Sequence, residues 1–237
     1  MSAARIRAIF SKELRDYRRN RFIVVTMALM PAIFIVVPII EIFVLPASAA
    51  GAFRVSLLWM LIIPTIVPAT LASYSVVGER EQGTLEPVLT TPISAEELLL
   101  GKALAALLPA LVIAYGVFGF FLAAPRLFAD PAVAAVAFRG SALLVQLLFT
   151  PLLAGWSIWV GIAISARSSD VRVAQQLGTL ASLPPLAVAA LLSLGVIQAS
   201  ITLALGLGAA LLLVDALGWR IVSVMFDRER LVTGTRS

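Results

Sequence analysis

The sequence predicts an all-α, polytopic membrane protein that forms a single domain over residues 1–237. Apolar residues make up 61% of the chain and charged residues 13%, whereas soluble domains average roughly 45–50% and 25%. The mean hydropathy is +1.03. Several apolar runs also reach the roughly 20 residues that a helix needs to cross a bilayer. They lack the two-residue alternation of membrane strands, so we expect helices.

Six apolar windows predict six transmembrane helices within residues 22–219. Their approximate bounds are 22–45, 55–77, 103–124, 141–166, 173–194 and 200–219. Prolines inside the windows are interpreted as kinks, because neighbouring helices can satisfy the carbonyls that proline leaves free. In the fifth window, Pro184-Pro185 predicts either a bend covered by neighbouring helices or a helix break that lines a cavity.

Lysine and arginine gather on alternate connections. The N-terminal tail carries seven, the connections around 78–102 and 167–172 carry two each, and the tail 220–237 carries four, which makes 15 on one side. The remaining connections carry three. Because cytoplasmic loops hold the excess of cations, we expect both termini in the cytoplasm. The net charge of +5 is then a signal of topology rather than of nucleic-acid binding.

Residues 1–21 predict a cytoplasmic amphipathic helix at the membrane interface. Apolar side chains recur at helical spacing from Ile6 to Tyr17 and form a stripe that can enter the headgroup boundary. The cations expected to meet anionic lipid or a carboxylate of a partner are Arg5, Arg7, Lys12 and Arg15. Two interpretations are open: the helix is a simple membrane anchor, or it also braces a soluble partner.

The connection between the second and third windows carries the clearest local signals. Ser94 followed by Glu97 matches a capping box and predicts a helix that continues into the third window. Gly83-Thr84 offers a turn and an N-cap, which predicts a short helix over residues 85–89. We therefore expect a short rigid helix across the cytoplasmic surface of the membrane.

The same connection, residues 78–102, contains a polar motif. It reads Glu79-Arg80-Glu81-x-Gly83-Thr84-x-Glu86, then Pro92, then Gly101-Lys102. Together with the six windows, the N-terminal helix and the stretch 226–231, this motif resembles the type-2 ATP-binding-cassette (ABC-2) permeases. The resemblance implies a coupling helix that docks on a separate ATPase subunit. The residues that it assigns to this contact are Glu79, Arg80, Glu81, Gly83, Thr84, Leu85, Glu86 and Pro92.

The resemblance also implies an assembly in the cytoplasmic membrane of a prokaryote. Two permease chains, identical or related, would join two ATPase subunits, and ATP and Mg would be bound by the ATPase. The chain itself has no complete phosphate-binding loop, since alanine follows Gly101-Lys102. It also contains no cysteine and no histidine. We therefore expect no catalytic residue, no metal site and no cofactor on this chain.

Polar or helix-breaking residues inside the windows are the candidates for a substrate pathway. They are Glu41, Gln146, Pro184 and Pro185. Glu41 is expected near the outer headgroups, where it could pair with Arg54, and Asp215 near the inner edge of the sixth window. Because intramembrane charges are few, we expect an amphiphilic or apolar cargo. The resemblance implies an exporter, and the sequence does not separate export from uptake.

The alternative function is an ion-coupled secondary transporter. Six spans could form two inverted triplets around a site at the midplane. No internal repeat is visible between the two halves of the sequence, and no carboxylate is expected at the midplane. An ABC permease subunit is therefore the favoured prediction.

Overall fold

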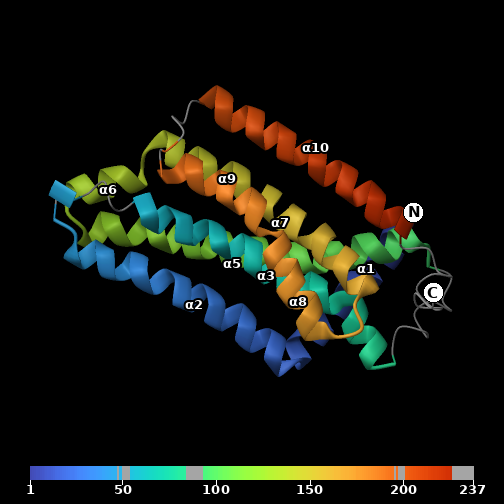
Figure 1. Cartoon of the computed structure of the whole chain (residues 1–237). Coiled ribbons are helices and arrows are strands. Elements are labelled where there is room, and N and C mark those ends of the chain that lie inside the picture. Colours follow the sequence, from blue (N-terminus) through green and yellow to red (C-terminus); the bar gives the residue numbers. More distant parts are fainter. Residues whose placement is uncertain (47, 50–53, 84–92, 195, 197–200, 226–237) are drawn as a thin grey trace.

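The computed structural model describes residues 1–46, 48–49, 54–83, 93–194, 196 and 201–225. All regular secondary structure in these residues is helical (Figure 1). The helices are α1 (Ala3–Arg19), α2 (Arg21–Val44), α3 (Arg54–Glu81), α5 (Ala95–Phe128), α6 (Pro131–Ala137), α7 (Gly140–Arg167), α8 (Val171–Ala181), α9 (Leu183–Leu194) and α10 (Ile201–Met225).

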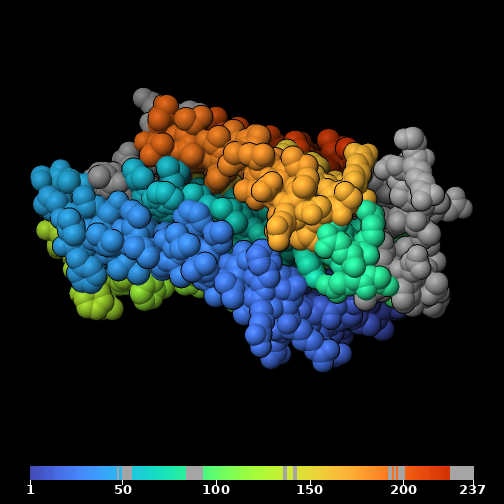
Figure 2. Space-filling view, turned by 60° about the horizontal axis from the view of Figure 1, so that its bottom comes forward, coloured from blue at the N-terminus to red at the C-terminus, as the bar shows by residue number. Residues whose placement is uncertain are grey.

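Helix α3 forms the centre of the bundle. It contacts α2, α5, α7, α8 and α9, and most of its length is buried. Figure 2 shows α3 between α2 and the α8–α9 pair. The outer helices α2 and α10 instead leave most of their apolar side chains exposed, as expected for surfaces that face lipid. A movement of α3 would therefore change the packing of the helices that contact it.

Five helices in the described part of the chain are long and apolar enough to cross a membrane. They are α2, α3, α5, α7 and α10, and they match the first four predicted windows and the sixth. Helix α5 begins at the predicted capping box, with Ser94 and Glu97 each bonded to the backbone of the other. The capping-box prediction is confirmed.

The fifth window is divided into two shorter helices. Helix α8 ends at Ala181, and α9 begins at Leu183, so of the two alternatives that the sequence left open, a bend or a break, the structure has the break. Pro184 and Pro185 lie in the first turn of α9, where a missing N–H leaves no helical bond unmade. The break is supported from α7, because the Trp156 indole donates to the carbonyl of Ala181 at 2.9 Å. The prolines therefore start a helix instead of kinking one.

The two ends of the bundle differ in chemistry. At one end lie α1, the last turn of α3, the first turns of α5 and the last turn of α10 (Figure 1). At the other end, Ser56 donates a hydrogen bond to Glu41, and the guanidinium of Arg126 lies 4.7 Å from the ring centre of Phe138. We call the first the α1 end and the second the α6 end.

Candidate functional site

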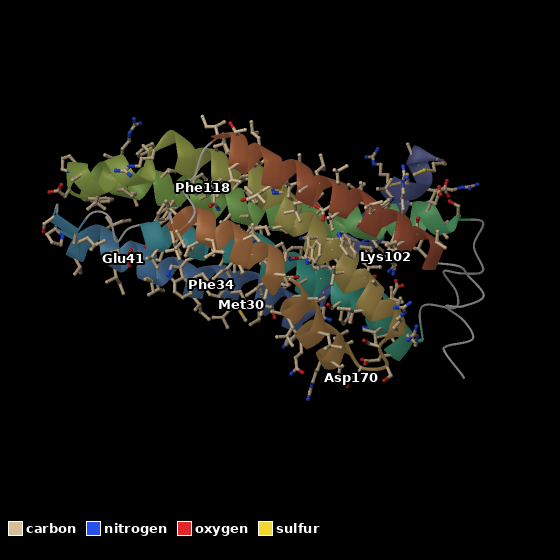
Figure 3. The ribbon with its side chains drawn as sticks, turned by 45° about the horizontal axis from the view of Figure 1, so that its top comes forward. Met30, Phe34, Glu41, Lys102, Phe118 and Asp170 are labelled. Carbon is tan, nitrogen blue, oxygen red and sulfur yellow. The ribbon has the colours of Figure 1, made fainter. Side chains whose placement is uncertain are left out.

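A buried lysine organises the α1 end. The side chain of Lys102 is fully buried, although it lies only eight residues into α5. Its Nζ is 2.9 Å from a carboxylate oxygen of Glu13 in α1 and 2.8 Å from one of Glu79 in α3. It also donates to the carbonyl oxygen of Ser75 at 2.8 Å. Lys102 thus joins three helices through one charge. Figure 3 labels its position in the bundle.

Lys12 extends this group into a cluster of alternating charges. It pairs with Glu79 and lies 3.3 Å from Glu13, so each lysine faces both carboxylates. We call Lys12, Glu13, Glu79 and Lys102 the ionic cluster. A buried ion pair is stable only when each charge keeps its partners, and the cluster meets this condition. It fixes the positions of α1, α3 and α5 relative to one another.

The cluster changes the acidity of its members. Burial alone raises the pKa of the Glu13 carboxyl, but attraction from Lys102 and Lys12 outweighs burial and lowers that pKa below its ordinary 4.5. Partial burial lowers the pKa of Lys12, but attraction from Glu13 and Glu79 outweighs it and raises that pKa above 10.5. Both residues are therefore ionised at neutral pH.

Helix α1 also packs closely on α5. A side chain at Gly101 would come within 2.6 Å of Ile9, so this glycine allows the two helices to approach. Glu97 accepts the backbone N–H of Ser2 at 2.6 Å and pairs with Arg5 at 3.5 Å. The apolar stripe predicted to enter the lipid boundary packs instead on the protein, because α5 offers it a matching apolar face.

Arg80 and Glu81 connect the end of α3 to two further helices. The Arg80 guanidinium donates to the carbonyl oxygens of Ala166 and Ser168, where α7 ends, at 3.1 and 2.9 Å. Glu81 accepts the N–H of Val171, the first residue of α8, at 3.1 Å. A cation at a helix C-terminus and an anion at a helix N-terminus are both favourable. The triplet Glu79-Arg80-Glu81 thus links α3 to α1, α5, α7 and α8.

Glu79 lies below the surface of the isolated chain. It was predicted to contact an ATPase, but only 6% of it is exposed, and its carboxylate is held by two lysines. Glu81 and Gly83 are exposed, and Gly83 has a φ of 68°, which favours glycine and fits the predicted turn. The remaining predicted contact residues lie outside the described part of the chain: Thr84, Leu85, Glu86 and Pro92.

The four cations predicted for the surface of α1 have different environments. Arg5 and Lys12 pair with carboxylates of this chain, so neither is a free surface charge. Arg7 and Arg15 are exposed. Arg15 lines a surface hollow of about 520 Å³ together with Leu14 and two more arginines. Only the outer face of α1 is thus available to lipid or to another protein.

No hydrogen bond or ion pair among the described residues joins any two of the four predicted pathway residues. Glu41 lies near the α6 end, far from Lys102 (Figure 3). Gln146 is buried in α7, and its amide nitrogen has no hydrogen-bond partner among the described groups. Pro184 is exposed and Pro185 half-buried at the start of α9. Described residues therefore give no common site for these four.

Sequence reasoning missed Glu13 and the role of Lys102. One signal could have revealed Glu13: it lies four residues from both Ile9 and Tyr17, inside the apolar stripe of α1. A carboxylate on a buried face needs a cation, and Lys102 is the lysine nearest a predicted span. In the described part of the chain, no group of three or more carboxylates has the arrangement of a metal site.

The comparison with protein families agrees with this architecture. The family of ABC-2 family transporter proteins matches residues 7–195, about four-fifths of the chain. The search of curated proteins found no match. The matched region includes most of α1, the triplet, the ionic cluster and the divided fifth window. The chain is therefore a transmembrane permease that belongs to the ABC-2 transporter family.

Proposed function

We propose that this chain is the membrane subunit of an ATP-driven exporter. Two permease chains and two copies of a separate ATPase form the complex, and the ATPase holds ATP and Mg. The cargo is amphiphilic or apolar, because the described helices carry few charges between the two ends of the bundle. Membership of the ABC-2 family supports the permease role, and the all-helical bundle is consistent with it.

The proposed topology has six crossings, with both termini in the cytoplasm. The α8–α9 pair makes the fifth crossing and is interrupted where Trp156 supports it. The α1 end faces the cytoplasm, because the connections at this end carry most of the lysine and arginine. The proposed orientation can be tested independently of transport.

The ATPase contacts the loop that follows Gly83. Residues 84–92 connect α3 to α5 in the sequence, and the facing ends of these two helices hold Glu79 and Lys102 of the ionic cluster. Glu79 acts behind the contact, as a positioning residue. The network around the triplet is the observation that carries this proposal, because it connects the loop to five helices.

Transmission of force follows from this arrangement. A push on the loop displaces the last turn of α3, and the cluster makes α1 and α5 follow. The links from Arg80 and Glu81 carry the push to α7 and α8. Because α3 is the central helix, a small movement at its end shifts the packing of the whole bundle.

The absence of cysteine in this chain allows a sharp test. Single cysteines replace Thr84, Glu86 or Asp130 in the tagged chain, and the complex is purified from its native membrane. A short cross-linker should join positions 84 and 86 to the ATPase. It should not join position 130, which lies at the α6 end next to α6. Cross-linking from 130, or none from 84 and 86, would overturn the proposal.

ATP hydrolysis gives a second readout for the same complex. The chain purified alone should show no ATPase activity, and the complex should show activity that rises with an amphiphilic cargo. Solute uptake driven only by an ion gradient, in vesicles that hold this chain and no ATPase, would instead favour the secondary transporter. The family match already argues against that alternative.

A further inference from the structure

A small cavity lies between α5, α7 and α10 and contains one carboxylate. Its volume is about 210 Å³, and it is lined by Leu104 and Leu107 of α5, Gly155 and Trp159 of α7, and Asp215 and Trp219 of α10, among other apolar side chains. Nothing in the proposed coupling mechanism uses it. It is therefore an independent feature of the membrane-spanning region.

The carboxylate of Asp215 has a defined position. The indole N–H of Trp159 donates to Oδ1 at 3.0 Å. Oδ2 lies over Gly155, only 3.1 Å from the place that a side chain there would occupy. Trp156 packs edge-on against Trp159, with ring centres 4.9 Å apart, and holds the donor in place. The second oxygen of Asp215 is left without a hydrogen bond from the described groups.

Among the described residues, the charge of Asp215 also lacks a cation. No lysine or arginine of the described residues lies within 4 Å of it, whereas the ionic cluster pairs each of its own charges. A carboxylate inside a membrane span is costly and is expected to have a partner. The side chain is only partly buried, so a ligand can reach it.

We propose that this cavity binds the cationic end of an amphiphile. Asp215 supplies the opposite charge, and the aromatic ring of Trp219, which lines the cavity, attracts an ammonium group by the cation–π interaction. Leu104 and Leu107 contact the first carbons of the apolar chain. An anionic amphiphile is excluded by repulsion from Asp215.

The position and size of the cavity agree with such a ligand. Asp215 lies ten residues before the end of α10, roughly 15 Å at ~1.5 Å per residue, which places it in the leaflet nearer the α1 end. The cavity is smaller than the roughly 300–1,000 Å³ of pockets that enclose a drug-sized molecule. The cavity therefore holds the charged end of the amphiphile, while the apolar tail of the amphiphile stays in lipid. We identify this ligand with the exported cargo, and that identification rests on the proposed function. The binding of a cationic amphiphile in the cavity does not depend on the proposed function.

The test measures binding by the full chain alone, in nanodiscs of phosphatidylcholine. Radiolabelled dodecyltrimethylammonium is titrated, and binding to empty nanodiscs is subtracted. We expect one saturable site per chain that dodecyl sulfate does not compete for. Asp215→Asn should weaken it about tenfold or more, because asparagine still accepts from Trp159 but carries no charge. The matched control is Asp130→Asn, which removes an exposed carboxylate near α6 and should leave binding unchanged.

A second variant covers the case in which Asp215→Asn does not fold. Leu107→Trp fills the cavity from α5 and keeps the carboxylate, so it should also abolish the saturable site. The inference is overturned if the wild-type chain shows no saturable binding, if Asp215→Asn or Leu107→Trp binds like the wild type, or if Asp130→Asn weakens binding equally. Because no ATPase is present, these results leave the proposed function untouched, and failure of the cross-linking test leaves the cavity untouched.

Discussion

The α1 end and the α6 end of the same bundle are held together by different interactions. All ion pairs among the described residues lie at the α1 end, where Lys12 and Lys102 are central. At the α6 end, contacts are mostly apolar and aromatic, such as Phe43 against Phe128 with ring centres 5.9 Å apart. Charged contacts are directional and keep their register, whereas apolar contacts can slide. The α1 end is thus suited to transmit force and the α6 end to adjust.

The largest effect should come from Lys102→Met. The change leaves Glu13 and Glu79 buried without their main cation, which costs about 3–5 kcal/mol for a broken buried pair. Thermal unfolding of the purified chain in detergent should show a large fall in Tm. The matched control is Arg139→Met, which removes an exposed cation at the α6 end and should change stability by about 0.5 kcal/mol or less.

A triple variant sharpens the interpretation of that result. Replacing Glu13 and Glu79 by glutamine together with Lys102→Met removes all the charges that the lysine balances. Neutral groups are much cheaper to bury, so the triple variant should recover a large part of the lost stability. If it is less stable than Lys102→Met alone, the damage comes from lost volume and not from unpaired charge.

A smaller difference should separate two neighbouring glutamates of the triplet. Glu79→Gln removes a buried partner of two lysines and should cost about 1–3 kcal/mol. Glu81→Gln is exposed and can still accept from Val171, so its cost should stay within about 0.5 kcal/mol. Equal losses of Tm in the two variants would contradict the buried role of Glu79.

Acid should weaken the α1 end. The pKa of Glu13 is lowered in the folded chain, so its stabilising charge is fully present above about pH 4.5 and is lost as the pH falls toward the lowered value. The Tm should therefore fall as the pH is lowered from about 4.5. In Glu13→Gln this acid-dependent part should disappear, and an unchanged pH profile in that variant would show that Glu13 is not responsible.

A small effect is also expected at the α6 end. Glu41→Gln keeps an acceptor for Ser56, so it should cost no more than about 1 kcal/mol. A fall in Tm as large as that of Glu79→Gln would show that both ends depend on charge, and the contrast between them would fail.

The sequence predicted most of the helices because their signals are local. Long apolar runs placed α2, α3, α5, α7 and α10 within a few residues, and the capping box located the start of α5. The fifth window was harder. Its apolar run is continuous, and Pro184-Pro185 allows either a bend or a break. The break is supported by Trp156, which lies 25 residues before the carbonyl that it bonds. A contact between helices does not appear in the hydropathy of either one.

The site was predicted less well than the fold, for the same reason. The triplet was found by its resemblance to a family, but its neighbours could not be read from its spacing. Glu79 meets Lys12, 67 residues away, and Lys102 meets Glu13, 89 residues away. Such pairs form only when α1 packs against α3 and α5, so the burial of Glu79 does not follow from the spacing of the triplet.

The central claim is that the ends of α1, α3 and α5 move as one body. Cysteines replace Ser11 in α1 and Gln82 just beyond α3, both of which are exposed, and each cysteine carries a spin label. The labels report the distance between these two elements in the assembled complex. The labelled chain is diluted with unlabelled chain. Pulsed electron resonance would compare the complex without nucleotide and with ATP held unhydrolysed. We expect the same narrow distance distribution in both states, broadened only by Lys102→Met. A clear shift of the distance on ATP binding in the wild-type chain would contradict it.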